Sequence, residues 1–303
     1  MPWFERFDEL ASRRFPEMEV LREEPMSRHT TFRIGGPARR LVRPAGPEEL
    51  AALLELAEAE NWPALVVGNG SNLLVADSGL DALVVHTGRL DRLERLGETG
   101  IRAGAGLSLA RLAVFAQQHA LSGLAFALGI PGTLGGAVCM NAGAYGGEMG
   151  QVVRAVTAWF PGEGTVRLES GALEFGYRRS LFSRRRGVVL EAELVLEPGD
   201  GQAIRAEMEE LGRRRREKQP LELPSAGSTF KRPEGRFAGA LIEGCGLKGL
   251  RFGGAQVSEK HAGFVVNTGS ATCADVLALI GRIQETVREE TGVMLEPEIK
   301  ILP

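Results

Sequence analysis

The residues of this sequence with the most direct chemical implication are the glycines of segment 129–147. The segment reads Gly-Ile-Pro-Gly-Thr-Leu-Gly-Gly-Ala-Val-Cys-Met-Asn-Ala-Gly-Ala-Tyr-Gly-Gly. Glycine lets the main chain turn through positive φ and approach a ligand closely, and successive free N–H groups form a concavity suited to pyrophosphate. The segment therefore predicts that backbone groups recognise a large anionic cofactor.

A second polar loop lies between two short apolar runs, in segment 66–75. Its centre, Gly68-Asn69-Gly70-Ser71-Asn72, predicts a tight turn between two strands, with Asn and Ser side chains that add hydrogen-bond donors for a diphosphate. The alternative is an ordinary glycine turn. Segments 68–70 and 104–106 imitate the start of the dinucleotide fingerprint, but both lack its third glycine, so a Rossmann fold is not favoured.

The first glycine loop, 129–136, leads into residues 137–140, whose sequence favours a helix. The N-terminus of such a helix would face negative charge. Two loops of this kind suggest one shared cofactor.

These loops need a framework, and the first 90 residues predict a small α/β lobe. Apolar residues at 50, 53, 54 and 57, with Pro47 in the first turn, predict a helix over 47–60. Short apolar runs predict strands at 40–42, 64–67 and 82–85.

Beyond residue 90 the pattern predicts a second, mixed α+β lobe. After residues 100–104, its expected elements are a helix near 108–119 and, beyond the glycine-rich segment, strands near 151–160, 165–168 and 187–196. Residues 201–218 predict a helix that ends in a basic run, and Pro220 and Pro224 then mark a domain boundary. The remainder predicts helices near 238–242 and over 273–290, and strands near 252, 264–266 and 293–302.

The composition of the chain excludes several classes of protein. With 303 residues, 44% hydrophobic and 25% charged residues and a net charge of -3, it resembles an average soluble enzyme rather than a nucleic-acid binder. No stretch approaches the roughly 18 apolar residues of a membrane span, so we expect a cytoplasmic protein. The basic runs 184–186 and 213–216 are expected to be solvated faces.

The cysteines and histidines predict neither a disulfide framework nor a metal site. Cys139, Cys245 and Cys273 are odd in number and widely spaced, and the four histidines form no ligand pair. We expect the three thiols to be buried.

Five motifs, taken in order, resemble the UDP-N-acetylenolpyruvoylglucosamine reductase family over residues 26 to 303. They are Thr31-Phe32-Arg33-Ile34-Gly35-Gly36, Gly68-Asn69-Gly70-Ser71-Asn72, residues 129–133 with 141–146, Tyr177-Arg178-Arg179-Ser180 and Gly227-Ser228-Thr229-Phe230-Lys231. The short 177–182 segment is similar to the smaller subtype, which lacks an extra loop over the substrate.

The resemblance implies an α+β fold with a two-lobed FAD-binding domain of the vanillyl-alcohol-oxidase type and a C-terminal α+β substrate domain. The first FAD-binding lobe would be 1–88, joined by the last strand at about 295–303. The second lobe would be 89–218, and the substrate-binding domain 219–294.

The resemblance also implies non-covalent FAD, NADPH as the reductant, and reduction of UDP-N-acetylglucosamine enolpyruvate to UDP-N-acetylmuramate in peptidoglycan precursor synthesis. We expect a monomer that binds neither nucleic acid nor membranes. The implied cofactor residues are Arg33, Gly68, Asn69, Gly70, Ser71, Asn72, Gly129, Ile130, Pro131, Gly132, Thr133, Gly135, Gly136, Asn141, Ala142 and Gly143. The implied substrate residues are Tyr145, Lys218 and Lys231; Arg232 follows Lys231 where relatives often carry Asn, which leaves the local diphosphate contacts open.

Reducing an enolpyruvyl ether requires stabilisation of an enediolate-like anion and then its protonation. The guanidinium of Arg178 suits the substrate carboxylate because it is always charged and matches that group with two hydrogen bonds. Ser228 suits proton donation to the basic intermediate. Family resemblance places Glu298, rather than Glu296, beside the substrate carboxylate. Taken singly, each could be an ordinary surface or turn residue.

Two other functions fit parts of this pattern. One is an alcohol or hydroxy-acid oxidase with the same FAD fold; such oxidases often tether FAD through His or Cys, and the two glycine loops offer only Cys139. The other is a nucleotide-binding scaffold without activity, which would need the glycine loops but not Arg178, Ser228 and Glu298 together.

Overall fold

The computed structural model describes all residues 1–303, and the chain divides into two compact units. Unit 1 consists of residues 1–22, 40–68 and 82–214, and unit 2 of residues 23–39, 69–81 and 215–303. Each unit is therefore assembled from three separate segments of the sequence. The three-part division at residues 88, 218 and 294 stays a prediction.

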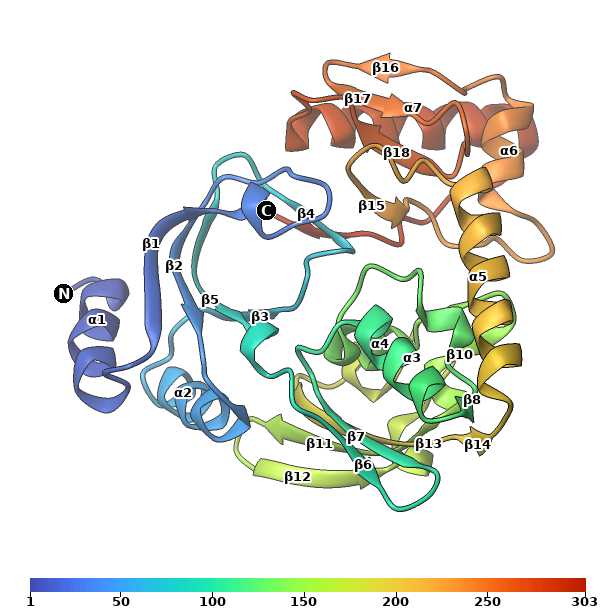
Figure 1. Ribbon diagram of the computed structural model, residues 1–303. Helices are drawn as coiled ribbons and strands as arrows, with labels where there is room; N and C mark the ends of the chain where they lie inside the picture. Colours follow the sequence, from blue (N-terminus) through green and yellow to red (C-terminus); the bar gives the residue numbers. More distant parts are fainter. The chain divides into compact units, whose positions relative to one another are not determined.

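A five-stranded antiparallel sheet forms the centre of unit 1 (Figure 1). Its strands, in spatial order, are β12 (Gly164–Glu169), β11 (Val153–Phe160), β13 (Val188–Val195), β7 (Gly100–Gly104) and β6 (Leu93–Leu96). Side chains alternate between the faces of a strand. Accordingly, Val156, Ala158 and Phe160 enter one hydrophobic core, and Trp159 enters another.

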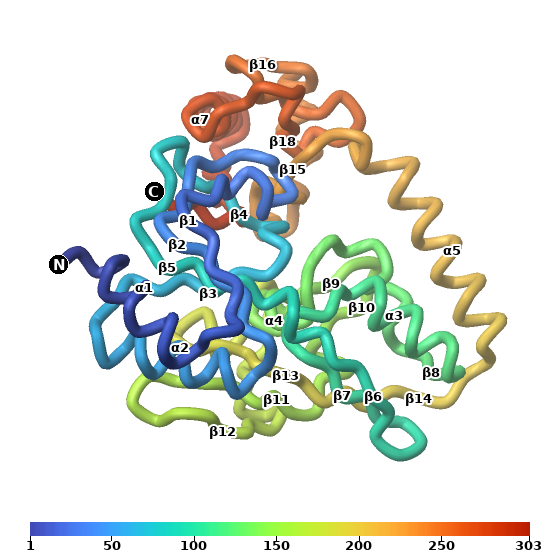
Figure 2. The backbone as a smooth tube through the Cα atoms, turned by 60° about the vertical axis from the view of Figure 1, so that its left-hand side comes forward, coloured from blue at the N-terminus to red at the C-terminus, as the bar shows by residue number.

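Helices supply the rest of both cores in unit 1. The core that contains Phe160 includes α3 (Leu109–Gln118) and α4 (Leu134–Met140), and α4 packs on β13. The core that contains Trp159 includes α1 (Trp3–Arg14) and α2 (Pro47–Ala59), which lie beside each other in Figure 2. Pro47 at the first turn of α2 and Ser108, whose hydroxyl accepts the Arg111 N–H at the start of α3, fix the two helix starts.

A second sheet joins β1 (Glu19–Pro25), β2 (Pro37–Arg43), β5 (Leu80–His86) and β3 (Ala64–Val67) in that order. The division between the units falls inside β1, β2 and β5. Strand β3 pairs with β5 in parallel, with Ala64 opposite Leu83.

Unit 2 contains a four-stranded sheet and two helices. The strands are β15 (Ser225–Ser228), β18 (Phe264–Asn267), β17 (Ala255–Val257) and β16 (Arg251–Phe252), and the helices are α6 (Ala238–Gly244) and α7 (Cys273–Thr291). Strand β19 (Lys300–Leu302) pairs in parallel with β4 (Leu73–Val75). The core joins Phe32, Ile34 and Leu74 to α7.

The remaining elements are short, apart from α5 (Gly201–Lys218). The pair β9 (Gly143–Ala144) and β10 (Gly147–Glu148) forms a hairpin, and β8 (Leu121–Ser122) pairs with β14 (Glu197–Pro198). Single 3-10 turns lie at Met26–Arg28, Thr87–Arg89, Ala125–Ala127, Met149–Gln151, Ser170–Leu173 and Leu181–Ser183. None of the helices combines the length and the apolar character that a bilayer span requires.

Most predicted elements lie within three residues of the observed ones, but three expectations were wrong. The helix expected at 137–140 begins at Leu134, because Leu134 and Gly135 already follow the turn at Thr133. The strand expected at 293–302 is confined to 300–302, since the backbone at 296–298 bonds instead to residues 229 and 231. Only Cys273 is buried; Cys139 and Cys245 are half-buried.

The second basic run is solvated, as expected. Arg213 and Arg214 are about half exposed, and both pair with Glu210. Hydrogen bonds from the two arginines lower the pKa of Glu210 to about 2.

Candidate cofactor and substrate site

The glycine loop 129–136 of unit 1 is anchored to the chain just before α3. The Leu109 N–H donates to the Gly132 carbonyl at 3.1 Å, and the Leu134 and Gly135 N–H groups donate to the Leu107 and Ala105 carbonyls, each at 2.8 Å. The N–H groups of Gly129, Gly132, Thr133 and Gly136 donate to no group of the chain. Four free donors in one anchored loop are suited to an anion.

The glycines of this loop, and Gly68, which packs against its Thr133, differ in the space that a side chain would find. A Cβ at Gly135 would lie 2.9 Å from the Cβ of Ala105, and one at Gly68 would lie 2.2 Å from Thr133 Oγ1. These two glycines let parts of the protein pack closely. Gly136 is exposed, and a Cβ there would meet only Thr133 Oγ1, at 3.8 Å, so the space above it is open to a ligand.

The loop 69–72 in unit 2 packs on the turn that contains Arg33. Gly70 has φ 60°, and a Cβ on it would lie 2.2 Å from the His29 carbonyl oxygen. The N–H groups of Gly70, Ser71 and Asn72 donate to no group of the chain. Arg33 is exposed at φ 55°, with its N–H bonded to the Thr30 carbonyl. Unit 2 therefore presents free backbone N–H donors in loop 69–72 and the Arg33 side chain, a cation, on the adjoining turn.

Tyr145 lies at the tip of the β9–β10 hairpin. It and Gly146 form the two-residue turn, with φ values of 54° and 90°. Two positive φ angles suit a hairpin turn that follows the twist of its strands, although the first usually falls on Asn, Asp or Gly. The Tyr145 side chain is 45% exposed, so its ring and hydroxyl are available to a ligand.

Arg178 lies in a tight turn closed by two backbone hydrogen bonds between Gly176 and Arg179, each 3.1 Å long. Its φ is 53°, in the left-handed region that favours glycine. Both terminal guanidinium nitrogens donate to the Gly143 carbonyl at 3.3 Å, and the guanidinium carbon lies 5.4 Å from the Tyr177 ring centre. The turn thus brings Arg178 to the base of the hairpin that carries Tyr145.

Ser228 and Glu298 lie on adjoining extended segments of unit 2. Ser228 ends β15 opposite Phe264, and the Glu298 N–H donates to the carbonyl of the next residue, Thr229, at 2.8 Å. Ser228 is exposed and Glu298 is half-buried. By contrast, the Glu296 side chain is 69% exposed and forms an ion pair with Lys231. The Asn72 side chain donates to the Glu298 carbonyl at 3.1 Å, which joins these segments to the loop 69–72.

His261, which the sequence analysis did not single out, lies next to the Ser228 strand. The Thr229 N–H donates to the Gly263 carbonyl, and the Gly263 N–H donates to His261 Nδ1 at 3.1 Å. Burial lowers the pKa of His261 below its ordinary value, so the ring is neutral at neutral pH. Its position beside Ser228 depends on strand pairing, which a lone histidine in a sequence does not reveal.

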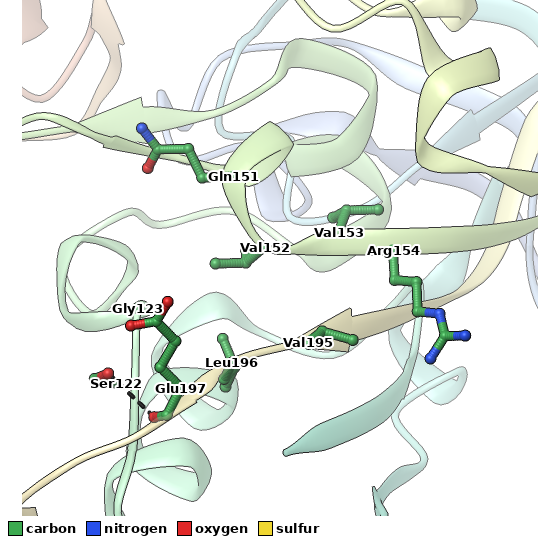
Figure 3. Close-up of a pocket in the computed structure, with 9 residues that line it drawn as sticks. All are labelled: Ser122, Gly123, Gln151, Val152, Val153, Arg154, Val195, Leu196 and Glu197. Carbon is green, nitrogen blue, oxygen red and sulfur yellow. Dashed lines mark hydrogen bonds between the residues drawn. The ribbon is translucent and has the colours of Figure 1, made fainter.

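A separate hollow in unit 1 contains none of the predicted site residues (Figure 3). Val152, Val195 and Leu196 line it together with Arg154 and Glu197. The described residues include no group of three or more His, Cys, Asp or Glu side chains suited to a metal ion.

Comparison with known proteins decides the family. Residues 219–302 match the family model for the C-terminal domain of UDP-N-acetylenolpyruvoylglucosamine reductase, and residues 38–169 match an FAD binding domain. The reductase of Caldanaerobacter subterraneus subsp. tengcongensis is 50% identical over 290 residues, which are 94% of this chain and 96% of that protein. The chain belongs to the UDP-N-acetylenolpyruvoylglucosamine reductase family.

Two further members of this reductase family agree over nearly the whole chain. The Clostridium perfringens reductase is 43% identical over 302 residues, which cover 100% of this chain and 99% of that protein. The crystal structure of the Thermus caldophilus reductase has a TM-score of 0.80 and 38% identity, and covers 95% of this chain and 99% of that one. The predicted family and the predicted α+β, FAD-binding fold class are confirmed.

The loops of this reductase fit the cofactor of the FAD binding domain. In unit 1, the four free N–H groups of loop 129–136 are donors that a pyrophosphate can use, and the open space above Gly136 admits it closely. In unit 2, loop 69–72 offers three further free N–H groups. Ile130 and Pro131 belong to loop 129–136 and Asn69 to loop 69–72, whereas Ala142 lies outside both loops, just after α4. Lys218 is exposed at the end of α5.

Proposed function

We propose that this chain reduces the enolpyruvyl group of UDP-N-acetylglucosamine enolpyruvate to the lactyl ether of UDP-N-acetylmuramate, with NADPH as the reductant. The observation that carries the proposal is 50% identity to a named reductase over almost the full length of both chains. Bound FAD would supply the redox chemistry, which is hydride transfer from NADPH to the terminal vinyl carbon of the substrate.

Arg178 is proposed to bind the substrate carboxylate. Its two terminal N–H groups share one carbonyl oxygen, that of Gly143, at 3.3 Å. A carboxylate offers two oxygens and a negative charge, so it binds the two N–H groups of the guanidinium more strongly than a single carbonyl oxygen does. The guanidinium would also stabilise the negative charge that reaches the carboxylate as the vinyl carbon is reduced.

Ser228 is proposed to donate its hydroxyl proton to the carbon next to the carboxylate. That proton and the hydride saturate the double bond, and the Ser228 alkoxide then regains a proton from solvent. Exposure of Ser228 at the end of β15 supports this role, since the hydroxyl is accessible. Glu298, on the extended segment whose N–H bonds to the Thr229 carbonyl, is proposed to act with Arg178 and Ser228 around the substrate carboxylate.

The remaining site residues are proposed to bind FAD and the UDP-sugar. Loop 129–136 of unit 1 would hold phosphate oxygens of FAD through its free N–H groups, and loop 69–72 and Arg33 are the proposed cofactor residues of unit 2. Tyr145, Lys218 and Lys231 would contact the UDP-sugar. We further propose that the protein is cytoplasmic and works as a monomer. Light scattering of the purified protein tests whether it is a monomer.

The first test is a visible absorbance spectrum of the purified protein, recorded anaerobically with NADPH and then with the enolpyruvyl substrate. Bleaching of a flavin band by NADPH and its return with the substrate are expected. Return of the band only with dioxygen, after reduction by an alcohol or hydroxy acid, would favour an oxidase. A protein that binds no FAD and oxidises no NADPH would leave a nucleotide-binding scaffold as the better explanation.

A further inference from the structure

The side chain of Asn141 is used entirely within the protein. Asn141 follows α4 and is 1% exposed. Its Oδ1 accepts the Gly150 N–H at 2.8 Å, and its Nδ2 donates to the Gly176 carbonyl at 3.1 Å. The family resemblance grouped Asn141 with the residues that contact FAD. However, both polar atoms of its side chain already form hydrogen bonds within the protein, and almost none of its surface is exposed. Such a side chain is better suited to holding loops together.

The two partners of Asn141 require an amide. One is a donor and the other an acceptor, so the orientation of the amide follows from its neighbours. A carboxylate at this position would keep the bond to Gly150 but would place a second acceptor against the Gly176 carbonyl. Residue 141 is also at φ 42°, a conformation that Asn adopts more readily than most residues and that glycine adopts freely.

Each partner belongs to a loop that carries a proposed substrate residue. The Met149 N–H donates to the Ala142 carbonyl, and together with the Gly150 bond this closes the base of the hairpin that presents Tyr145. Gly176 begins the turn that contains Arg178. Asn141 therefore connects the two loops directly, in addition to the hydrogen bonds from Arg178 to Gly143.

Both loops contain backbone conformations that need support. Tyr145 and Arg178 have φ values of 54° and 53°, and such residues persist only where their surroundings restrain them, at about 1 kcal/mol each or more. Ser180, which is 2% exposed, supplies a second restraint, because its hydroxyl donates to the Cys139 carbonyl at 2.8 Å. The end of α4 thus holds the Arg178 turn at both sides.

We propose that Asn141 is a positioning residue for the substrate carboxylate, which it serves by fixing the Arg178 turn against the Tyr145 hairpin. This inference rests on the proposed function, since it assigns the carboxylate to Arg178. It predicts that loss of the Asn141 amide affects the substrate half of the reaction and leaves the flavin half nearly unchanged.

The main test compares Asn141→Gly and Asn141→Asp with the wild type. Glycine keeps the backbone conformation and removes both hydrogen bonds, whereas Asp removes only the donor to Gly176. We expect both variants to retain FAD and to be reduced by NADPH within about twofold of the wild-type rate. Reoxidation by the enolpyruvyl substrate should slow about tenfold to a hundredfold, the scale of a misplaced binding group. Asn61→Gly and Asn61→Asp are matched controls, because Asn61 also has φ 54° but is exposed and distant in sequence from both loops.

A double-mutant cycle with Arg178→Lys tests the route of the effect. If Asn141 acts through Arg178, the loss in substrate affinity of the oxidised enzyme, measured by calorimetry, will be much smaller in the Arg178→Lys background. If the affinity losses of the two single variants simply add in the double variant, the proposal is wrong. Loss of FAD with equal slowing of both half-reactions would also overturn it and would indicate that Asn141 belongs to the cofactor site.

Hydrogen exchange of the wild type keeps the proposal testable if the variants do not fold. The Gly150 amide should be protected equally with and without FAD, because its acceptor is Asn141 in both states. Faster exchange after FAD binds would show that the side chain has turned to the cofactor and would contradict the proposal. A wild type inactive toward the enolpyruvyl substrate would instead remove the proposed function, while the Gly150 result would still report on the contact.

Discussion

Arg178 combines a charge that the proposed reaction needs with a backbone angle that favours glycine. Arg178→Gly should therefore separate stability from activity. We expect the variant to be at least as stable as the wild type in urea unfolding. Glycine at this positive φ removes the backbone strain of a non-glycine residue, which is about 1 kcal/mol. Reoxidation by the enolpyruvyl substrate should fall by about a hundredfold or more, since the carboxylate loses its cation.

Arg179→Gly is the control for this comparison. Arg179 is exposed next to Arg178 and has no positive φ, so glycine there gains no relief of strain. It should lower the free energy of unfolding slightly and leave reoxidation near the wild-type rate. If Arg178→Gly proves the less stable of the two, the account of strain at Arg178 is wrong.

Ser228→Ala should affect only one half-reaction. Reduction of the flavin by NADPH does not use the Ser228 proton, so its rate should stay within about twofold, whereas reoxidation by the substrate should slow about a hundredfold or more. Anaerobic stopped-flow absorbance measures both steps. Equal slowing of the two steps would remove Ser228 from the role of proton donor.

The sequence identified the residue types at the candidate site better than their individual contacts. The glycine loops were predictable because missing side chains and free N–H groups are local properties. The contacts of Asn141 were not, because Gly150 and Gly176 lie 9 and 35 residues away. Positive φ at Arg178 was equally hidden, since arginine gives no sign of such a conformation.

At the scale of elements, a partly buried ion pair ties α1 to β2. Arg40 Nε and one terminal nitrogen each donate to Asp8 at 2.7 Å, and the Arg40 side chain is only 7% exposed. Asp8→Asn should lower the free energy of unfolding by about 2 kcal/mol, because it leaves the buried cation without its charged partner. Urea unfolding at pH 7 measures the loss, and Glu9→Gln, whose carboxylate has only partly exposed partners, should cost about 0.5 kcal/mol or less.

The same ion pair predicts a dependence on pH. Burial tends to raise the pKa of Asp8, but hydrogen bonds and charge from Arg40 and Arg22 outweigh it, and the net pKa lies below the ordinary value of 3.8. A folded pKa below the unfolded one means that the stabilisation is present above 3.8 and is lost as the pH falls through the folded value. The stability difference between wild type and Asp8→Asn should thus shrink below about pH 4; a constant difference down to pH 2 would contradict the assignment.

Periodicity predicted the elements with strong local patterns and missed those that depend on distant partners. The helix expected at 47–60 is observed at Pro47–Ala59, since proline at its start and apolar spacing act locally. Strands β6 and β17 were not predicted, because their short mixed sequences become strands by pairing with β7 and β18. Helix α1 was also missed, although Phe7 and Ala11 have helical spacing and are buried.

At the scale of the molecule, the separate segments of unit 2 predict that its C-terminal part cannot fold alone. A fragment of residues 215–303 lacks Phe32, Ile34 and Leu74, which are 1%, 2% and 0% exposed in the core of unit 2. Their burial is worth about 6 kcal/mol together, which is comparable with the whole stability of a domain. The fragment should show no cooperative thermal transition by circular dichroism.

Co-expression of residues 1–214 should restore that transition, because it supplies the missing segments. Polar contacts would return with them, including the bonds from the Cys273 and Ala274 N–H groups to Asp77 at the start of α7. A cooperative transition in the isolated fragment would show instead that residues 219–302, the span of the family model, form a self-sufficient domain.

The parallel pairing of β19 with β4 has a consequence for biosynthesis. Leu73–Val75 leaves the ribosome more than two hundred residues before Lys300–Leu302, the strand that completes its hydrogen bonds. Until Lys300–Leu302 has been synthesised, β4 lacks this pairing partner and the apolar side chain of Leu74 lacks the later part of its core. We therefore expect a nascent chain stalled within this interval to expose an unpaired strand and an apolar side chain, which favours aggregation.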